Sequence, residues 1–410
     1  MTTRVLYVTS RFPSITTTFV ANEMTAVQAA GCDVHVAPLW DSLEGHAGHE
    51  VEKPFLSKVT RFAQRSPATW LDVAKAIKRR PSVLGLIAKL VPGHLKSPWL
   101  FAKLVVSIPR GLYFGVWAAE NDVDRLHAHF LTTPTTVAMI AAEVAGIPFT
   151  ATAHAFDITS EDPRAMNGSV ALKCLAAESI VTISEYNVAD ILRRWPELDD
   201  IDLQVIYNGI DTTMFSPESA DAPFEGAEPF SVLSVSRLTA KKGHEYLIRA
   251  IAQLRDDGVN VRLDIYGDGE LKDELTDLIR SLDCDGHITL HGAVSQSVVR
   301  EACERADIFS LACVHLESGD ADGLPTVIIE ALAVGRPTVS TQVTGVPEIV
   351  VDGETGLCVP ERDAAALADA INWMIENPID AREMGQAGRK LVETQFDRAG
   401  AAQRLLELWA

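Results

Sequence analysis

The stretch DGLPTVIIEALAVG, residues 322–335, joins a short polar loop to an apolar segment with helical character. Pro325 suits a first helical turn, where a missing N–H costs nothing, and Gly335 suits a helix end. The first amides of such a helix have no intrahelical partner, and the helix dipole favours an anion there. The stretch therefore predicts a phosphate site with Asp322 in front of it and Glu330 along the first turns. An ordinary loop and helix with two solvated acids would explain the same residues, so the rest of the chain decides.

Short apolar runs alternate with helical stretches throughout the chain. Predicted helices include Thr18–Ala30, Gly243–Leu254, Leu271–Leu282 and Ser295–Arg305. The predicted strands are Arg4–Val8, Asp33–Pro38, Leu126–His129, Phe149–Ala153, Ile180–Ile183 and Gln204–Tyr207, then Val232–Val235, Arg262–Tyr266, Ile288–His291, Ile308–Leu311 and Pro337–Ser340. This βαβ alternation, repeated twice, predicts an α/β protein with two Rossmann-like doubly wound domains. Such domains bind ligands at the carboxyl ends of their strands, so the active site is expected in the cleft between them.

The length of 410 residues suits two domains of ordinary size. Residues 214–229 are rich in Pro, Ala, Asp and Glu, have no apolar period, and are predicted to be a linker. They separate an N-terminal domain, 1–213, from a C-terminal domain, 230–390. The remaining segment, 391–410, is predicted to be a C-terminal helix that packs back toward the N-terminal domain.

The charge of the chain is strongly acidic but uneven. A net charge of −20 argues against nucleic acid as a partner, because phosphate backbones demand basic surface. Residues 53–110, however, hold 12 Lys or Arg and one acid, Asp72, a local charge of +11. A basic island in an acidic protein predicts an anionic surface nearby, and a membrane leaflet is the commonest one.

The six cysteines form no C-x-x-C pair and no disulfide framework, which predicts reduced thiols in a cytoplasmic protein. The chain enters a strand at Arg4, so no signal peptide is expected before the fold. The most membrane-like run, Trp99 to Ala119, is interrupted by Lys103, Pro109 and Arg110 and is predicted not to span a bilayer.

Two cations follow the first strand of the C-terminal domain. Ser236-Arg237-Leu238 comes directly after the strand, and Lys242-Gly243 precedes the next helix. Cations at a strand end beside a helix start predict a diphosphate site, especially with a second anion site near Leu324 in the same domain. A pair of solvated surface cations is the alternative for these two residues taken alone.

Taken together, these motifs resemble those of the family-4 retaining glycosyltransferases of GT-B fold. The motifs that carry the resemblance are Asn208-Gly209-Ile210-Asp211, Ser236-Arg237-Leu238, Lys241-Lys242-Gly243, Asp322-x7-Glu330 with Gly335-x-Pro337, Gly345-Val346-Pro347-Glu348, and Asp352-Gly353-x-Thr355-Gly356. In the N-terminal half, further motifs resemble the colanic-acid and amylovoran members that serve exopolysaccharide assembly: Arg11-Phe12-Pro13, Thr18-Phe19 with Glu23, His127-Ala128-His129-Phe130, and Thr152-Ala153-His154 with Asp157-Ile158.

The resemblance implies a donor site in the C-terminal domain. Arg237 and Lys242 would hold the diphosphate of a nucleotide-diphosphate sugar and stabilise the leaving nucleotide without a metal. Glu330 would bind the ribose, and Asp322 would bind hydroxyl groups of the sugar. The neighbouring donor-binding residues would be Gly323, Leu324, Pro325, Thr326 and, in a turn after a strand, Gly267.

On the side of the N-terminal domain, the resemblance places His154 near the anomeric centre. Arg11, Phe12, Thr18 and His129 would lie on the acceptor side. The acceptor hydroxyl would attack from the face that the nucleotide leaves, so the protein mainly orients the reactants. The chain departs from the family pattern at Asp322, where glutamate is usual, at Ala155, where glycine is common, and at residues 10–13, which lack a glycine pair.

His127 and His129 alternate on a predicted strand and so face one side, an arrangement that could suit a metal. No third ligand is evident in the sequence, and packed or cleft-lining histidines are the preferred interpretation. We therefore expect no metal and no cofactor. Two other functions stay open: a nucleotide-sugar epimerase of the same architecture, and a non-catalytic nucleotide-sugar-binding module.

The basic island 53–110 predicts a membrane-facing insertion. Its cations interleave with apolar residues, as on helices that lie in a membrane interface. These apolar residues are Phe55, Trp70, Leu84, Leu86, Ile87, Trp99, Leu100 and Phe101. The alternative is that these helices pack on the first domain with their cations solvated. We expect peripheral association with the inner face of the plasma membrane, over a lipid-linked or glycolipid acceptor. Charge reversal at Lys75, Lys78, Arg79 and Arg80 is expected to weaken it.

Overall fold

The computed structural model describes residues 2–14, 18–41, 50–159, 168–215 and 229–410. The chain divides into two compact units: unit 1 is Met1–Tyr207 with Ala401–Ala410, and unit 2 is Asn208–Gly400. The chain leaves unit 1 after Tyr207, ahead of the boundary at residue 213 that composition suggests. Residues 216–228, most of the predicted linker, lie outside the described residues.

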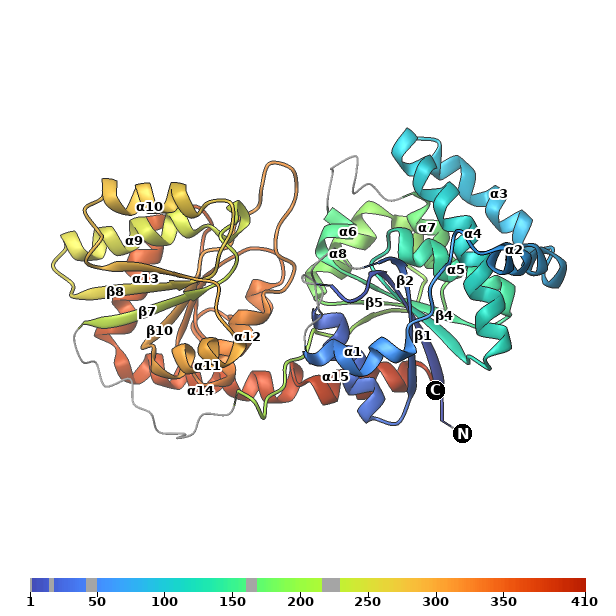
Figure 1. The fold of residues 1–410 in the computed structure, drawn as a ribbon. Helices are drawn as coiled ribbons and strands as arrows, with labels where there is room; N and C mark the ends of the chain where they lie inside the picture. Colours follow the sequence, from blue (N-terminus) through green and yellow to red (C-terminus); the bar gives the residue numbers. More distant parts are fainter. Residues whose placement is uncertain (1, 15–17, 42–49, 160–167, 216–228) are drawn as a thin grey trace. The chain divides into compact units, whose positions relative to one another are not determined.

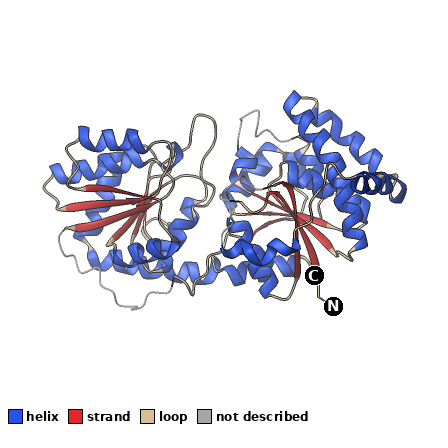
Figure 2. Cartoon of the chain, viewed as in Figure 1, coloured by secondary structure: helices blue, strands red, loops and turns tan. Residues whose placement is uncertain are grey.

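Unit 1 contains a six-stranded parallel sheet, drawn with its helices in Figures 1 and 2. The strands, in their order across the sheet, are β2 (Asp33–Trp40), β1 (Arg4–Arg11), β3 (Arg125–His129), β4 (Phe149–Ala153), β5 (Ser179–Thr182) and β6 (Leu203–Val205). The helices are α1 (Thr18–Ala29), η1 (Glu50–Lys58), α2 (Pro67–Arg79), α3 (Val83–His94), α4 (Pro98–Glu120), α5 (Thr133–Ala145), α6 (Ala155–Thr159), α7 (Val170–Ala176), α8 (Glu185–Arg194), η2 (Pro196–Leu198) and α15 (Arg398–Leu408).

Both faces of this sheet are covered, as parallel sheets require. On β1, Leu6 and Val8 join a core built with α4 and α5, whereas Val5 and Tyr7 join a second core built with α1 and α15. The same alternation on β3 sends Leu126 and Ala128 to the first core. It sends His127 and His129 to the other face, where both rings contact Tyr7.

Helix α4 is long and apolar enough to cross a membrane by length and composition, but half of its apolar window is buried within the protein. Gly111 and Gly115 of α4 lie so close to α5 that a Cβ atom would overlap Ile140 or Val144. Such close packing is typical of the core helix of a folded domain. The described contacts therefore pack α4 against α5 within unit 1, and that this segment does not span stays a prediction.

Unit 2 contains a second six-stranded parallel sheet. Its strands, in their order across the sheet, are β12 (Leu357–Val359), β11 (Thr338–Thr341), β10 (Ile308–Leu311), β7 (Phe230–Val235), β8 (Val261–Tyr266) and β9 (Ile288–Gly292). The helices are η3 (Ala240–Lys242), α9 (His244–Asp256), α10 (Lys272–Ser281), α11 (Gln296–Arg305), α12 (Thr326–Ala333), η4 (Val346–Glu348), α13 (Ala364–Glu376) and α14 (Pro378–Gln395). In Figure 1, α9 and α10 lie on one side of this sheet and α11 on the other. The prediction of two doubly wound α/β domains is thus confirmed.

The segment 391–410 is not one helix. Helix α14 ends at Gln395, and α15 begins at Arg398. The break is stabilised locally, because Asp397 Oδ2 accepts a hydrogen bond of 3.0 Å from the Gly400 amide near the start of α15. Residues Ala401–Ala410 belong to unit 1, where Trp409 packs against Tyr7 and His127.

Each sheet has one point at which the strand order reverses. In unit 1 this switch point lies between β1 and β3, and in unit 2 it lies between β7 and β10. Segments leaving the two central strands diverge to opposite faces there, which opens a crevice at the carboxyl ends. The residues that follow these four strands are therefore the first candidates for a site.

Candidate active site

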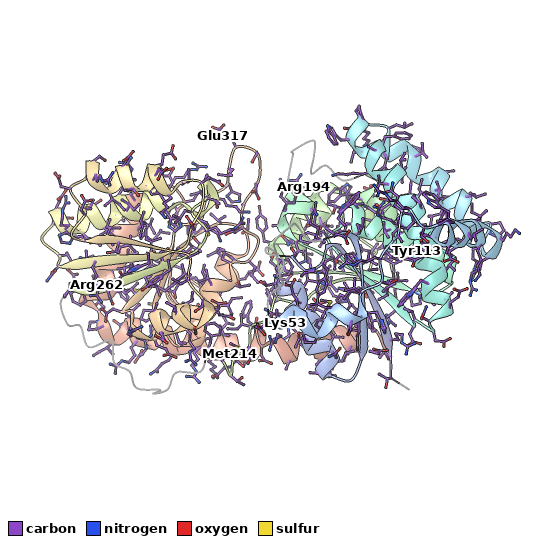
Figure 3. The ribbon with its side chains drawn as sticks, viewed as in Figure 1. Lys53, Tyr113, Arg194, Met214, Arg262 and Glu317 are labelled. Atoms are coloured by element: carbon purple, nitrogen blue, oxygen red, sulfur yellow. The ribbon has the colours of Figure 1, made fainter. Side chains whose placement is uncertain are left out.

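In unit 2, the segments that follow β7 and β10 bring opposite charges together. Lys242 forms an ion pair with Asp322, and Lys241 Nζ lies 3.3 Å from Asp322 Oδ1. Lys241 Nζ also lies 3.2 Å from Asp320 Oδ1. The structure thus joins the predicted Lys242 and Asp322 at the switch point and adds Lys241 and Asp320, to which the sequence interpretation gave no role in donor binding. The loop between β10 and α12 that carries both aspartates is marked in Figure 3 by Glu317.

The pair between Lys242 and Asp322 is ionised. Burial alone would raise the pKa of Asp322, but the charges of Lys242 and Lys241 outweigh burial and lower it. Burial alone would lower the pKa of Lys242, but the charge of Asp322 outweighs burial and raises it. Both partners therefore carry full charge at neutral pH, as a site for an anionic ligand needs.

Two glycines allow the strand ends of unit 2 to approach closely. Gly267, at a φ of +145°, lies against Ser236, and Gly243, at a φ of +61°, lies against Ala312. A Cβ atom at either glycine would overlap the carbonyl oxygen of its neighbour, and both φ values strain other residues. The two contacts hold the segments after β7, β8 and β10 together. Arg237, within this group of segments, is exposed, so its guanidinium is accessible to a ligand.

Helix α12 begins one residue later than the sequence suggests. Pro325 is its N-cap, with a ψ of 105°, and Thr326 is the first helical residue. The Gly323 carbonyl accepts hydrogen bonds from the Gly345 amide at 3.1 Å and from Thr344 Oγ1 at 3.2 Å. In the described part of the chain, the amides of Thr326 and Val327 donate to no other group. The helix start predicted from the sequence is therefore present beside Asp322, with two amides that could donate to a ligand.

Glu330 lies on the same helix, and its side chain is mostly buried. Burial raises its pKa to about 7, although a hydrogen bond from Gln296 acts in the opposite direction. A carboxyl group with this pKa is partly protonated at neutral pH, so it can donate or accept a hydrogen bond. The structure thus places Glu330 on α12, with its carboxyl group near Gln296 of α11.

In unit 1, His154 follows β4 and lies between two aromatic rings. Its ring centroid is 4.8 Å from that of Phe19 and 4.6 Å from that of Phe130. Its amide donates to Asp157 Oδ1 at 2.8 Å, and Asp157 Oδ2 accepts from the Leu131 amide at 2.6 Å. Asp157 therefore ties the segment after β4 to the segment after β3. Burial lowers the pKa of His154 well below its usual range, so its ring is neutral.

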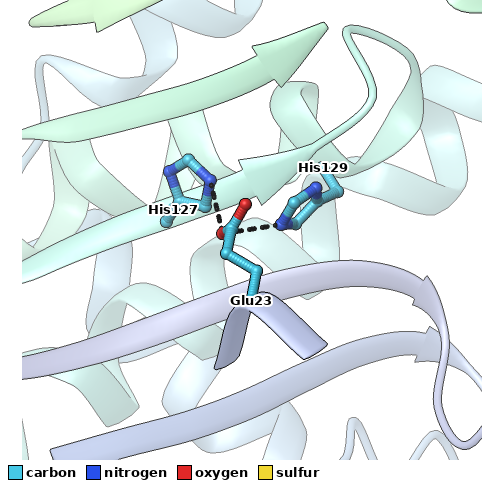
Figure 4. A group of neighbouring side chains, drawn as sticks. All are labelled: Glu23, His127 and His129. Carbon is cyan, nitrogen blue, oxygen red and sulfur yellow. Dashed lines mark hydrogen bonds and ion pairs between the residues drawn. The ribbon is translucent and has the colours of Figure 1, made fainter. Parts of the chain in front are cut away.

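Next to His154 lies a network of polar side chains, in which the histidines are buried and Glu23 is partly exposed (Figure 4). His129 Nδ1 is 3.2 Å from His154 Nε2, and His129 Nε2 is 3.2 Å from Glu23 Oε1. His127 Nε2 is 3.5 Å from the same Glu23 oxygen, which also accepts a hydrogen bond of 3.0 Å from the Tyr7 hydroxyl. The sequence motif containing Glu23 gave no sign of this role, because only the docking of α1 on β3 brings it there.

This network adds a candidate third ligand that the sequence did not show, and the expectation that no metal binds stays a prediction. Glu23 supplies the third metal-binding group that His127 and His129 seemed to lack, and the three ligand atoms lie within 4.8 Å of one another. The group could hold a cation by its chemistry. Neighbouring hydroxyl groups already contact the possible ligand atoms of His127. Thr150 Oγ1 lies 2.8 Å from its Nδ1, and Thr152 Oγ1 lies 3.0 Å from its Nε2.

The other residues predicted for the acceptor side differ in exposure. Arg11 is exposed at the end of β1 and donates to the Asp41 carbonyl at 2.7 Å. Thr18 is partly exposed at the start of α1. Phe12 is buried in the core against Phe55, and His129 is buried behind His154. Arg11 and Thr18 are therefore accessible from solvent, whereas Phe12 and His129 lie in the interior of unit 1.

Two family models match nearly the whole chain between them. A model described as glycosyltransferase family 4 matches residues 16–214, and one described as glycosyl transferases group 1 matches residues 216–391. The protein WcaL of Escherichia coli (strain K12), named as a candidate colanic acid biosynthesis glycosyltransferase, is 30% identical over 416 residues, which cover 97% of both chains. The amylovoran biosynthesis glycosyltransferase AmsK of Erwinia amylovora is 33% identical over 206 residues, half of each chain.

Solved structures of other proteins share the fold of this chain. The crystal structure of HepE from Anabaena in complex with UDP matches with a TM-score of 0.71 and 18% identity, over 100% of this chain and 99% of that one. A glycosyltransferase structure from Rickettsia africae matches equally well, with a TM-score of 0.71 and 18% identity over 100% and 98% of the two chains. At this identity the likeness concerns the fold.

Proposed function

Because the chain belongs to the family-4 glycosyltransferases of GT-B fold, we propose that it is a retaining hexosyltransferase that uses a nucleotide-diphosphate sugar. The observation that carries this proposal is the ionised pair of Lys242 and Asp322 beside the start of α12, at the switch point of unit 2. Cations and helix amides suit a diphosphate, and a carboxylate among them suits sugar hydroxyl groups. The UDP held by HepE, a protein of the same fold, agrees with this choice of ligand.

In the proposed reaction, fixed charge stabilises the departing nucleotide. Arg237 and Lys242 bind the diphosphate, and Lys241 adds a third cation at the same strand ends. These charges are in place before the reaction, so they need no reorganisation as negative charge develops on the leaving group. Glu330 binds the ribose, Asp322 holds the sugar, and His154 acts near the anomeric centre.

We also propose that the enzyme needs no divalent metal. The pattern Asp320-x-Asp322 could bind one in principle, but Lys241 lies within 3.3 Å of both carboxylates. The lysines therefore already neutralise the acids that would coordinate a cation. With three cations and a helix start facing the diphosphate, a metal would add little charge stabilisation.

The acceptor we propose is a lipid-linked sugar or glycolipid of polysaccharide synthesis. The names of WcaL and AmsK, which concern colanic acid and amylovoran, support a role in exopolysaccharide assembly. The surface of α2, α3 and α4 supports a membrane-bound acceptor, because large apolar side chains remain exposed on these basic helices. They are Trp70, Leu71, Leu84, Leu95, Trp99, Phe101 and Val105, and we call them the α2–α4 surface.

The structure refines which residues of the basic island reach this surface. Of the apolar residues named from the sequence, Phe55 and Leu100 are buried, and Leu86 and Ile87 pack against the core. Among the cations, Lys75 pairs with Glu120 of α4, whereas Lys78 and Arg79 of α2 are exposed. We propose that the exposed members attach a cytoplasmic enzyme to the inner face of the plasma membrane.

A donor screen followed by a transfer assay tests the proposal. Thermal shifts with UDP-, GDP- and ADP-sugars identify the donor, because a bound ligand stabilises the folded chain by mass action. With that donor and a lipid-linked acceptor, we expect a glycosidic product of unchanged anomeric configuration by NMR. Isomerised donor without acceptor would instead indicate an epimerase, and binding without hydrolysis or transfer would indicate a non-catalytic module.

A further inference from the structure

The loop between β10 and α12, residues 312–325, is held by residues that follow the two neighbouring strands of its sheet. It carries Asp320 and Asp322, the acids that pair with the lysines after β7. Inside the loop, the Gly319 amide donates to the Leu316 carbonyl at 2.9 Å, and the Leu316 amide donates to the Asp320 carbonyl at 2.9 Å. These turns shape the tip of the loop but do not fix it against the rest of unit 2. Because ordering a loop costs conformational entropy, the position of Asp322 depends on contacts with other segments.

At the start of the loop, Glu361 holds His315. Glu361 follows β12, and its Oε2 accepts a hydrogen bond of 2.7 Å from the His315 amide. Its Oε1 lies 2.9 Å from Nδ1 of the same histidine. The next residue, Arg362, donates to the His315 carbonyl. The amide, the carbonyl and the ring of one loop residue are therefore all bound by the segment after β12. The neighbouring Val314 amide donates to the Lys241 carbonyl at 3.0 Å, which ties the loop to the lysine pair as well.

At the end of the loop, Thr344 holds the backbone of Asp322 and Gly323. Thr344 follows β11, the strand that pairs with β10, and its side chain is buried. Its hydroxyl lies within hydrogen-bonding distance of three carbonyl oxygens, those of Asp322, of Gly323 at 3.2 Å and of Val343 at 2.9 Å. The Gly345 amide donates to the Gly323 carbonyl at 3.1 Å. The backbone that carries the Asp322 carboxylate is therefore bound by the segment after β11.

The backbone of Thr344 is itself in an unfavourable conformation. Its φ is 47°, in the left-handed region, where a β-branched residue is an outlier. Such a conformation persists only where surrounding contacts hold it, and residues of this kind cluster at functional sites. Glycine or asparagine would fit this backbone with less strain, but neither carries a hydroxyl group. The contacts of the hydroxyl with the carbonyls of Asp322 and Gly323 give a physical reason for a threonine here.

We propose that Glu361 and Thr344 are positioning residues of the donor site, which hold the loop at its two ends. Together they fix the Asp322 carboxylate beside Lys242, where it binds hydroxyl groups of the sugar. Both act through the loop, since their described hydrogen bonds are to His315 and to backbone carbonyls. A binding group must be held to within about 0.5 Å by its supporting residues. The benefit for sugar binding rests on the proposed transferase function, whereas the anchoring of the loop does not.

Hydrogen exchange of the ligand-free full chain, followed by mass spectrometry, tests the anchors without any donor. In Glu361→Ala, the bonded amides of residues 314–319 should exchange about tenfold faster or more, because His315 loses a bond to a charged acceptor. The amides of β10 should exchange as in the wild type. Glu354→Ala is the matched control, since it removes an exposed carboxylate in the turn before β12 and should leave the loop unchanged. Unchanged exchange of residues 314–319 in Glu361→Ala would overturn the proposal.

Thr344→Val tests the other end of the loop, because valine keeps the branched shape of threonine and lacks its hydroxyl. The Gly345 amide, which donates to the Gly323 carbonyl, is the reporter, and its exchange should become about threefold faster or more. Thr344→Ser keeps the hydroxyl and should exchange like the wild type. If Thr344→Val exchanges as slowly as Thr344→Ser, the hydroxyl does not hold the loop and the proposed role of Thr344 is wrong.

Calorimetric titration separates a positioning role from a general structural one. The probes are UDP with UDP-glucose and GDP with GDP-mannose. For a pair that binds, Glu361→Ala should weaken binding of the nucleotide sugar about tenfold and change binding of the diphosphate by no more than about twofold. The reason is that Asp322 is assigned to the sugar, whereas Arg237 and Lys242 are assigned to the diphosphate. Equal losses for both ligands would contradict the positioning role. Absence of binding by all four probes would count against the proposed donor, whereas the exchange rates test the anchors independently of it.

Discussion

The two switch points hold their charged groups in different ways. At the ends of β7 and β10, Lys242 and Asp322 are mostly buried but ionised, and a second lysine lies beside them. Near the ends of β3 and β4, three buried histidines and the partly exposed Glu23 of α1 form a network in which His127 and His154 are neutral. Fixed charges suit the binding of an anion, whereas a neutral and oriented ring suits the geometry of a reacting group.

The largest expected effect is that of Lys242→Ala. It removes a charge-assisted contact worth roughly 1.5–3 kcal/mol, so the affinity for UDP or GDP should fall about tenfold or more. It also leaves Asp322 with Lys241 alone, which should cost about 1–3 kcal/mol of stability. Titration calorimetry and urea unfolding measure the two quantities.

Arg237→Ala is the matched control for that experiment. Its side chain is exposed, so its removal should weaken nucleotide binding by a similar factor while changing stability by no more than about 0.5 kcal/mol. Unchanged nucleotide affinity in both variants would contradict the assignment of the diphosphate to this switch point. Equal losses of stability in the two variants would show that the ion pair of Lys242 and Asp322 does not contribute the expected stability.

The two units should also differ in their response to membranes. Lys78→Glu with Arg79→Glu on α2 should weaken binding to phosphatidylglycerol vesicles at low salt by about 2 kcal/mol, at about 1 kcal/mol for each cation. Arg382→Glu with Lys390→Glu on α14 makes the same change of charge in unit 2 and should have little effect. If the wild-type protein does not bind such vesicles in a flotation assay, the membrane proposal is wrong, whereas the transferase proposal is unaffected.

Glu330 is an exception to this difference between the units. It belongs to unit 2, yet burial favours its neutral form, whereas Lys242 and Asp322 are ionised. Its folded-state pKa of about 7 lies above its unfolded value, so its contribution to stability is complete at low pH and is lost as pH rises through 7. Glu330→Gln cannot ionise. Relative to wild type, it should gain about 1–2 kcal/mol in urea unfolding at pH 8 and close to nothing at pH 4, below the unfolded pKa of about 4.3, after allowance for partial exposure. The gain should be accompanied by weaker nucleotide binding, and a wild-type pH profile would refute the assignment.

The smallest expected effect is that of chelation. Because Lys241 and Lys242 already neutralise Asp320 and Asp322, transfer in EDTA should equal transfer without it. Complete loss of activity, restored by magnesium or manganese, would contradict metal independence. The same assay in Glu23→Gln would then show whether the metal lies in unit 1.

Much of this architecture was predictable because its signals are local. Strands such as Arg4–Val8 and helices such as Leu271–Leu282 are recognised by periodicity, and they lie close to β1 and α10. The donor half could be predicted because its residues stand beside strand ends, and the sheet order then brings Lys242 to Asp322. Strand β12, three residues long, carries too little periodicity to be recognised.

The network of unit 1 could not be predicted in the same way. Glu23 meets His129 only because α1 docks on the face of the sheet that carries the odd-numbered residues of β3. Phe12 follows β1 as a site residue would, yet it turns into the core against Phe55. Likewise, charge counting could not show that Lys75 is paired within the protein, because Glu120 lies far from it in sequence.

Calorimetric titration of the full chain with UDP, GDP and ADP, and with the corresponding monophosphates, tests the central claim most directly. The central claim is that the charges at the switch point of unit 2 bind the diphosphate of a sugar donor. We predict that at least one diphosphate binds, that its monophosphate binds more weakly, and that Lys242→Ala lowers the diphosphate affinity about tenfold or more. Equal affinities for diphosphate and monophosphate, or a diphosphate affinity unchanged in Lys242→Ala, would contradict it.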